Sequence, residues 1–292
     1  MSDGEVMSDI LVEPDWLEAH LDDPAVRILD TRVTIVPQPP GPSDYVSLQP
    51  EYLESHIPGA AYLHMVDDLS DPDGAFPFAL PSPEVIWRRL GDLGIRSGDI
   101  IVLYGNHISF AVHRCWWVLA VAGADVRLLN TTFANWAAAD RPLASGEESF
   151  QPTTFTATPH LDWVASKADV IASMDDADTI TLNALSAEQH AGRGQPFGRA
   201  GRIPGSLSLP AAAMMQSDSG AFRSLDDLAS TLAVTGVSKS DPVITYCGGG
   251  IAASTTFVAL RLLGYENLSL YDGSLLEWSA DPDLPLLIDG LE

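Results

Sequence analysis

One loop of the sequence carries residues suited to nucleophilic chemistry. Cys247 is followed by three glycines and three small or apolar residues, Gly248, Gly249, Gly250, Ile251, Ala252 and Ala253. Glycines have no Cβ atom, so the backbone can curl tightly and turn successive N–H groups toward the sulfur. The positive end of a following helix adds to this effect, and such surroundings favour the nucleophilic thiolate. The sequence predicts a catalytic Cys247 in a backbone cradle, Gly248 to Ala253, which also holds an anion bonded to the sulfur.

A free cysteine can instead be a core residue, because cysteine is among the most buried residue types. For Cys247 this alternative leaves three glycines at a strand-to-helix junction without a purpose. Cys115 lies in the middle of the apolar segment 112–119, so we expect it to pack in a core. Two cysteines are too few for a disulfide framework.

The elements around this loop occur twice in the chain. Ile57-Pro58-Gly59 recurs as Ile203-Pro204-Gly205, and Asp15-Trp16 recurs as Asp162-Trp163. Further matches follow in the same order and at nearly constant spacing: Gly94, Asp99, Tyr104, Leu128 and Trp136 with Gly236, Asp241, Tyr246, Leu270 and Trp278. An ordered series of this kind indicates a duplicated domain.

Each half alternates short apolar segments with helical patterns. We expect strands at 27–29, 100–104 and 126–129 in the first half, and at 179–182, 243–246 and 268–271 in the second. This alternation predicts an α/β fold in which each domain has a mostly parallel sheet with helices on both faces. The predicted division is a domain at 9–143, a linker at 144–160 that contains two prolines, and a domain at 161–290.

Composition and charge exclude several classes of function. The 292 residues include 40 Asp and Glu against 15 Lys and Arg, for a formal charge of −25. An acidic surface repels phosphate backbones and anionic lipids, so we expect no nucleic-acid and no membrane partner. The longest apolar run, 115–124, is much shorter than the ~20 residues that span a bilayer. The acidic amino terminus does not resemble a secretory signal, which predicts a cytoplasmic protein.

Together these motifs resemble those of tandem-domain rhodanese-type sulfurtransferases, the thiosulfate and 3-mercaptopyruvate sulfurtransferase family. The cysteine loop is preceded by an Ile-Pro-Gly turn and followed by the segment 271–278, and 52–60 fits the family's other signature. The resemblance implies two tandem rhodanese-like domains, of which the second is catalytic, with the active site near their interface. The first-half loop at 104–107 has no cysteine. There His107 either faces the active site or, as we expect, has a capping or surface role.

The resemblance also implies a mechanism. Cys247 takes a sulfane sulfur from a small anionic donor, thiosulfate or 3-mercaptopyruvate, and becomes a persulfide. A thiophilic acceptor, which is cyanide, a small thiol or a thioredoxin-like protein, then removes the sulfur. Each step needs a reachable, stabilised sulfur anion. No metal and no organic cofactor is required.

The sequence departs from the family where the donor binds. The loop positions that are basic in thiosulfate-type members are Gly248 and Gly249, and the histidine of mercaptopyruvate-type members is replaced by Phe78. The family's donor-binding arginines are missing from their usual places. Substitutes occur nearby at Arg193, Arg199 and Arg202. Arginine suits anion binding, and Arg199 is our first choice. Its loss should raise KM for an anionic donor, unless these arginines only form ion pairs in a solvated loop.

Two alternative functions and the role of one further residue, Asp272, complete the sequence analysis. A phosphatase of the Cys-x5-Arg type needs a guanidinium six residues after the cysteine, where this chain has Ala253. A rhodanese-like binding or regulatory module with little transferase activity is the remaining alternative, and persulfide formation on Cys247 would separate the two. For Asp272 we expect an ordinary turn or capping role.

Overall fold

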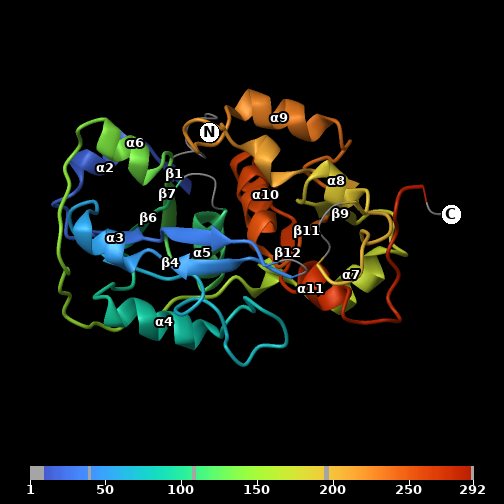
Figure 1. The fold of residues 1–292 in the computed structure, drawn as a ribbon, viewed down its shortest axis with the longest axis horizontal. Helices are drawn as coiled ribbons and strands as arrows, with labels where there is room; N and C mark the ends of the chain where they lie inside the picture. The colour runs from blue at the N-terminus through green and yellow to red at the C-terminus, as the bar shows by residue number, and fades with distance from the viewer. Residues whose placement is uncertain (1–9, 39–40, 107–109, 194–196, 291–292) are drawn as a thin grey trace.

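The computed structural model describes residues 10–38, 41–106, 110–193 and 197–290. In these ranges it contains two five-stranded sheets, one in each half of the chain, and a separate two-stranded hairpin (Figure 1). Every strand pair within the two large sheets is parallel. Parallel strands are normally buried on both faces, which agrees with their apolar sequences.

The first half is ordered β1-β7-β6-β2-β5 across its sheet. Its strands are β1 (Leu11–Val12), β2 (Val26–Asp30), β5 (Ala60–Tyr62), β6 (Ile100–Tyr104) and β7 (Val126–Leu129). The antiparallel hairpin consists of β3 (Val33–Val36) and β4 (Asp44–Ser47). The helices are α2 (Pro14–Ala19), α3 (Gln49–Glu54), α4 (Pro83–Asp92), α5 (Ala111–Val121) and α6 (Phe133–Ala138).

The second half repeats this arrangement in the order β8-β12-β11-β9-β10. Its strands are β8 (Val164–Ala165), β9 (Ile180–Asn183), β10 (Leu207–Ser208), β11 (Val243–Tyr246) and β12 (Leu268–Tyr271). The helices are α7 (Lys167–Ser173), α8 (Ala187–His190), α9 (Leu225–Ala233), α10 (Ile251–Leu262) and α11 (Ser274–Trp278), with 3-10 turns η1 (Leu161–Trp163) and η2 (Ala211–Met214). The identical strand order confirms the duplication and the predicted fold class.

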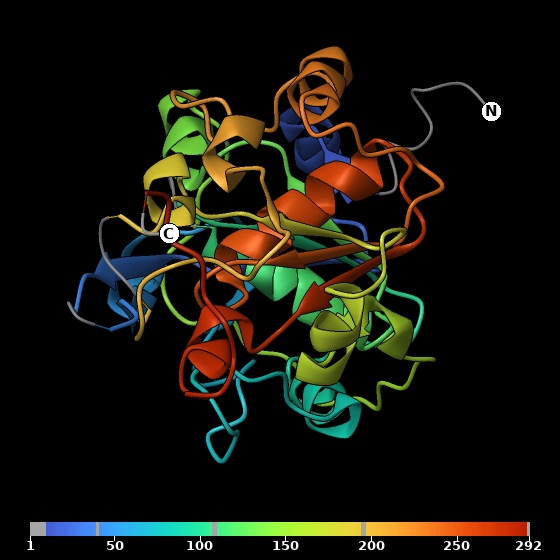
Figure 2. The same ribbon diagram turned by 90° about the vertical axis from the view of Figure 1, so that its right-hand side faces the viewer.

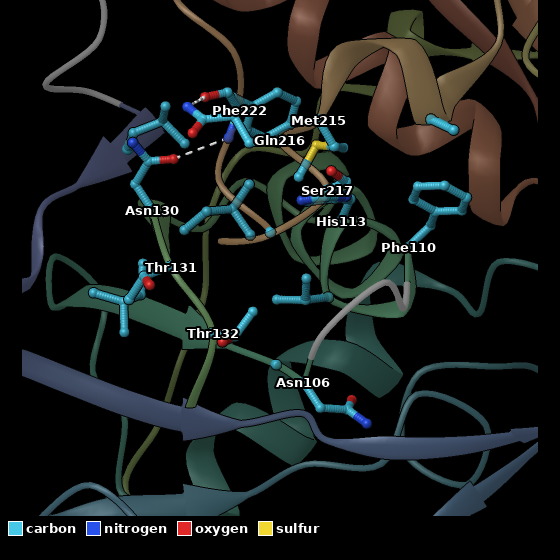
Figure 3. A pocket seen from close by; sticks show the side chains of 17 residues that line it. Asn106, Phe110, His113, Asn130, Thr131, Thr132, Met215, Gln216, Ser217 and Phe222 are labelled. Carbon is cyan, nitrogen blue, oxygen red and sulfur yellow. Dashed lines mark hydrogen bonds between the residues drawn. The ribbon is translucent and has the colours of Figure 1, made fainter. Parts of the chain in front are cut away.

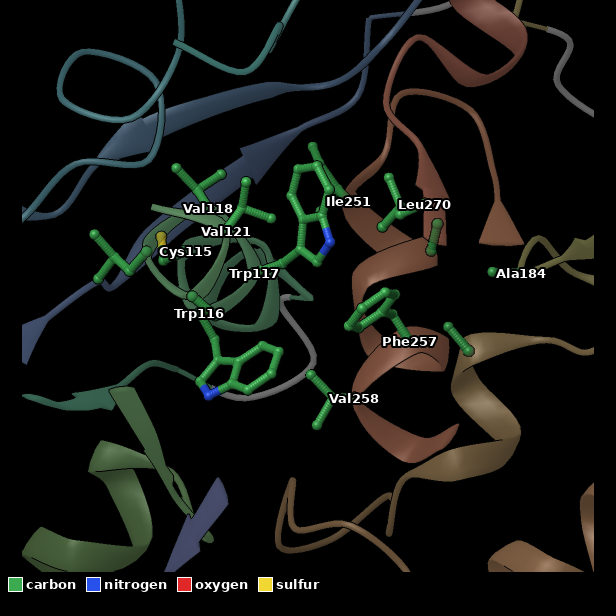
Figure 4. Packing of buried hydrophobic residues seen from close by; sticks show 14 of the residues in the cluster. Cys115, Trp116, Trp117, Val118, Val121, Ala184, Ile251, Phe257, Val258 and Leu270 are labelled. Carbon is green, nitrogen blue, oxygen red and sulfur yellow. The ribbon is translucent and has the colours of Figure 1, made fainter. Parts of the chain in front are cut away.

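The two halves meet along α5 and α10, which lie side by side at the centre of the molecule (Figures 1 and 2). Figure 4 shows Trp117 and Phe257 facing each other across this contact, and both are fully buried. Cys115 is also fully buried, and burial raises the pKa of its thiol to about 12. The expectation that Cys115 is a core residue is therefore confirmed.

The segment expected to be a linker packs tightly on the first half. The Thr153 N–H donates to the carbonyl of Gly91 at 2.8 Å, and Phe155 is buried. A Cβ atom on Gly123, whose φ is +86°, would lie 2.2 Å from the carbonyl oxygen of Thr158. Only glycine fits at this position, so the segment 153–158 packs closely against the first half.

A buried histidine joins the two halves at the same contact. His113 of α5 is 5% exposed, and its Nδ1 lies 2.8 Å from Oγ1 of Thr255 in α10. Burial lowers the pKa of His113 to about 3, so the ring is neutral near pH 7. An exposed histidine in the unfolded chain has a pKa of about 6.5. Below pH 6.5 the unfolded chain binds a proton at His113 that the folded protein does not bind. The contribution of His113 to the free energy of unfolding is therefore fully present above pH 6.5 and is lost as the pH falls toward 3.

We therefore expect His113 to make the protein sensitive to mild acid. Between pH 7 and pH 5 the wild type should lose about 2 kcal/mol of unfolding free energy that a His113→Gln variant does not lose. Glutamine can still bond Thr255 but does not titrate. Urea denaturation at several pH values measures the difference, and parallel pH profiles for the two proteins would show that His113 is not responsible.

Candidate active site

The Cys247 loop connects β11 to α10, and its backbone is held by hydrogen bonds to one serine, Ser274. The N–H groups of Cys247 and Gly250 donate to Oγ of Ser274 at 3.1 and 3.2 Å. That hydroxyl in turn donates to the carbonyl of Tyr271 at 2.8 Å. Ser274 has a φ of +47°, an uncommon conformation for a residue other than glycine. A strained residue held by three hydrogen bonds indicates that the loop shape is strongly specified.

This arrangement divides the predicted cradle into two groups of donors. The N–H of Gly250 donates to Ser274, so this donor already has a partner and Gly250 helps to shape the loop. Its place in the cradle for the sulfur stays a prediction. Within the described part of the chain, no acceptor pairs with the N–H groups of Gly248, Gly249, Ile251, Ala252 and Ala253. Unpaired donors at the start of a helix attract anions. The loop thus supplies several hydrogen-bond donors beside Cys247. Cys247 itself is buried, with 2% of its surface exposed.

At two positions of the loop, the surrounding atoms leave no room for a Cβ atom. A Cβ atom on Gly248 would lie 2.3 Å from the ring of Phe197, so that ring covers the backbone directly. Gly250 has a φ of +78°, and a Cβ there would lie 2.9 Å from Nη1 of Arg114. Packing around the loop therefore requires glycine at both positions, in addition to any chemical purpose.

A cavity of about 100 Å³ opens over the cysteine between the two halves. Its walls include four aromatic rings, Tyr45, Phe78, Phe110 and Phe197. Tyr45 comes from β4 and meets Phe78 edge-on, with ring centroids 5.4 Å apart. Burial, with a smaller contribution from the charge of Cys247, raises the pKa of Tyr45 far above its usual value. The first half thus forms part of the cavity wall, as the resemblance implied for the position of the active site.

A buried ion pair holds this wall against the loop. Nη2 of Arg114 in α5 lies 2.6 Å from Oδ1 of Asp272, with the two side chains 1% and 8% exposed. The same Nη2 donates to the carbonyl of Phe78 at 2.7 Å, and Oδ2 of Asp272 accepts from the N–H of Leu80 at 2.8 Å. The pair therefore ties residues 78–80 of the first half to the segment that follows β12, beside the loop at Gly250.

Sequence reasoning missed Arg114 and assigned Asp272 only a turn or capping role. The correction for Asp272 is that its carboxylate joins the two halves. A signal for Arg114 was present, because it is a lone charged side chain inside the apolar segment 112–119. Charged residues are almost never fully buried unless they are paired. The aromatic wall offered no comparable signal, since Tyr45, Phe110 and Phe197 belong to three distant segments.

The three arginines predicted to bind the donor do not line this cavity as the structure describes it. Arg199 donates to three carbonyl groups, those of Ser279 at 3.0 Å, Asp281 at 2.6 Å and Leu284 at 2.9 Å. Its guanidinium group is thereby committed to the segment after α11. Donor binding by Arg199 stays a prediction, and the geometry favours a structural role.

The other two arginines also have partners elsewhere. Arg193 pairs with Glu188 at 3.0 Å on the exposed surface. Arg202 pairs with Asp289 at 2.6 Å and also donates to the carbonyl of His190. His107, which we considered as a residue facing the site, lies outside the described residues.

Replacement of Arg199 tests these two roles against each other. We expect Arg199→Ala to lower the free energy of unfolding by about 1 kcal/mol, because three carbonyls lose a charged donor. KM for thiosulfate and for 3-mercaptopyruvate should not change. Arg193→Ala is the matched control, since an exposed ion pair contributes little. A raised KM with unchanged stability would restore the donor-binding role.

Two further observations concern metal ions and membranes. Among the described residues there is no group of three or more His, Cys, Asp or Glu side chains placed to hold a metal ion. In the same residues, no helix has the length and apolar character needed to cross a membrane.

Comparison with known proteins places the chain in a family. The Rhodanese-like domain description matches residues 13–139 and 166–281. The chain is 32% identical over 279 residues to 3-mercaptopyruvate sulfurtransferase of Escherichia coli (strain K12), covering 94% of this chain and 96% of that protein. It is 31% identical over 240 residues to a putative thiosulfate sulfurtransferase of Mycobacterium tuberculosis (strain CDC 1551 / Oshkosh), covering 80% and 84% of the two chains.

A solved structure agrees with these sequence matches. The crystal structure of the 3-mercaptopyruvate sulfurtransferase SseA from Escherichia coli superposes with a TM-score of 0.78 at 29% identity, covering 90% of this chain and 98% of that one. The duplicated parallel sheets, the cysteine loop and these similarities lead to one conclusion. The chain belongs to the rhodanese family and is a sulfurtransferase with two rhodanese-like domains.

Proposed function

We propose that Cys247 is the residue that carries the transferred sulfur. Its thiolate attacks the outer sulfur of the donor, an S–S or C–S bond in the donor breaks, and sulfite or pyruvate leaves with the bonding electrons. In the second case the leaving enolate takes a proton from water. The observation that supports this role is the set of unpaired loop N–H groups beside Cys247. They would stabilise the resulting persulfide anion without any reorganisation.

The second half-reaction returns the enzyme to its starting state. An acceptor thiolate or cyanide attacks the outer sulfur, the S–S bond of the persulfide breaks, and Cys247 leaves as a thiolate. We propose a small thiol or cyanide as the acceptor, because the cavity holds only about 100 Å³. A thioredoxin-like protein would have to present its thiol at the mouth of the cavity. The cytoplasmic location expected from the sequence remains a prediction.

Within the small anionic donors, we propose 3-mercaptopyruvate ahead of thiosulfate. Among the described residues that line the cavity, none carries a charged side chain. Thiosulfate is a dianion whose sulfonate needs a cation, whereas 3-mercaptopyruvate presents one carboxylate and an uncharged carbonyl. The loop donors can bind a single anionic group of this kind. The curated relative that is 32% identical is itself named for 3-mercaptopyruvate.

Mass spectrometry of the intact protein tests this function directly. The protein is incubated with 3-mercaptopyruvate or with thiosulfate, and the mass is measured before and after addition of cyanide. We expect a gain of one sulfur atom that cyanide removes, with 3-mercaptopyruvate the more effective donor. A greater yield with thiosulfate would contradict the donor preference. If neither donor added sulfur, the binding or regulatory interpretation would be favoured instead.

A further inference from the structure

A second cavity lies between the two halves, on the side of the first sheet. It holds about 150 Å³, which makes it larger than the cavity over Cys247. One wall is formed by Leu11 of β1, by residues at the carboxyl ends of β6 and β7, and by the start of α5. The opposite wall is formed by residues of the segment 212–222, which belongs to the second half (Figure 3).

The place of this cavity corresponds to that of the active site in the other half. Gly105 follows Tyr104 at the end of β6, as Cys247 follows Tyr246 at the end of β11. Gly105 lines this cavity, as Cys247 lines the other. Open parallel sheets bind their ligands beyond the carboxyl ends of the strands. The first half thus has a cavity at the position where a ligand would bind, without the nucleophile.

The lining predicts the charge of a ligand. Most of the wall is apolar, with contributions from Leu11, Val112, Leu128, Leu129, Met215 and Phe222. Among the described lining residues there is no Asp, Glu, Lys or Arg. A charged ligand would lose its hydration here without gaining an ionic partner. The cavity therefore suits an uncharged molecule with a mainly apolar body.

The buried imidazole of His113 adds a specific polar contact. His113 lines the cavity and packs against Phe222, with ring centroids 5.0 Å apart. Its Nδ1 is bonded to Thr255, whereas Nε2 has no hydrogen-bond partner among the described residues. The ring is neutral, because burial lowers the pKa of His113. A neutral imidazole nitrogen without a partner can form one hydrogen bond with a hydroxyl or carbonyl group.

We propose that this cavity is a binding site for an uncharged, mainly apolar small molecule that has one hydrogen-bonding group for His113. A cavity of similar volume and apolar lining is large enough for a benzene ring. Phe110 lines both this cavity and the one over Cys247, so a ligand here contacts part of the active-site wall. The N–H of Arg114, one turn along α5, donates to the carbonyl of Phe110. Occupancy should therefore change the transfer reaction without competition with the donor.

Phenol is a suitable probe, because it combines a benzene ring with one hydroxyl group. Benzoate and benzylammonium have similar shapes but carry a charge. Binding is followed by NMR through the ring signals of His113 in protein with Cys247→Ser, so the result does not depend on transfer activity. We expect saturable binding of phenol and no saturation by either charged molecule. Saturation by benzoate with equal affinity would overturn the proposal.

Two variants show whether the signal comes from this cavity. Ala212 lines the cavity and is exposed, so Ala212→Phe should fill its opening and weaken phenol binding at least about tenfold, equivalent to about 1.4 kcal/mol. Ala233→Phe changes an exposed alanine of α9 outside the cavity and should bind phenol as the unchanged protein does. Unaltered binding to Ala212→Phe, or inhibition by phenol that is purely competitive with the donor, would overturn the proposal.

Discussion

Replacing Cys247 by serine is expected to abolish sulfur transfer from every donor. The rate should fall by more than about 10³-fold, because a hydroxyl is a weak nucleophile and cannot carry sulfur as a persulfide. The fold should change little, since serine is nearly the same size and the loop is held through the backbone N–H of residue 247. Steady-state assays with thiosulfate and 3-mercaptopyruvate measure the loss, and circular dichroism checks the fold.

The other cysteine provides the matched control. Cys115 is fully buried in α5, and burial raises the pKa of its thiol to about 12, so it is protonated and out of reach of a donor. Cys115→Ala should keep the transfer rate and lose about 1 kcal/mol of stability through the small cavity it creates. Sulfur found on Cys115, or substantial transfer by Cys247→Ser, would show that the nucleophile has been assigned wrongly.

The central strands and the duplication were predictable because they depend on local patterns. β6, β7, β11 and β12 have the predicted bounds, since each is a short, mostly apolar segment between turns. The edge strands β1, β5, β8 and β10 were missed because each has only two or three residues. The hairpin β3–β4 was not predicted, and most of its side chains are exposed.

The active site likewise combines residues that are contiguous in the sequence with residues from separate segments of the chain. The cysteine, the glycines and the following helix are contiguous, so their chemistry could be inferred from the sequence. The wall that faces them comes from the first half, and which of its side chains reach Cys247 depends on how α5 packs on α10. The three arginines were grouped by their closeness in sequence. In the folded chain each has a separate partner, on α8 or in the segment after α11.

Loss of the Arg114 side chain is expected to have the second-largest effect. Arg114→Met keeps an apolar side chain in α5 but leaves the buried carboxylate of Asp272 without its cation. Removing one member of a buried pair costs about 3–5 kcal/mol, which thermal or urea denaturation will measure. The carbonyl of Phe78 also loses its donor, so the aromatic wall should shift relative to the loop. We expect kcat/KM to fall at least about tenfold in addition to the loss of stability.

A second substitution separates two roles of Arg114, which are to neutralise the carboxylate of Asp272 and to position Phe78 and the loop. In Arg114→Met combined with Asp272→Asn no charge is left unpaired, while asparagine keeps an oxygen that can accept from the N–H of Leu80. The double variant should regain at least about 2 kcal/mol of the stability lost by Arg114→Met, because the two side chains are in direct contact. It should not regain kcat/KM, since Phe78 and the loop at Gly250 still lack the guanidinium that fixes them. Recovery of both quantities together would mean that Arg114 only stabilises the fold. Recovery of stability alone would establish that the half without the nucleophile positions the active site of the other.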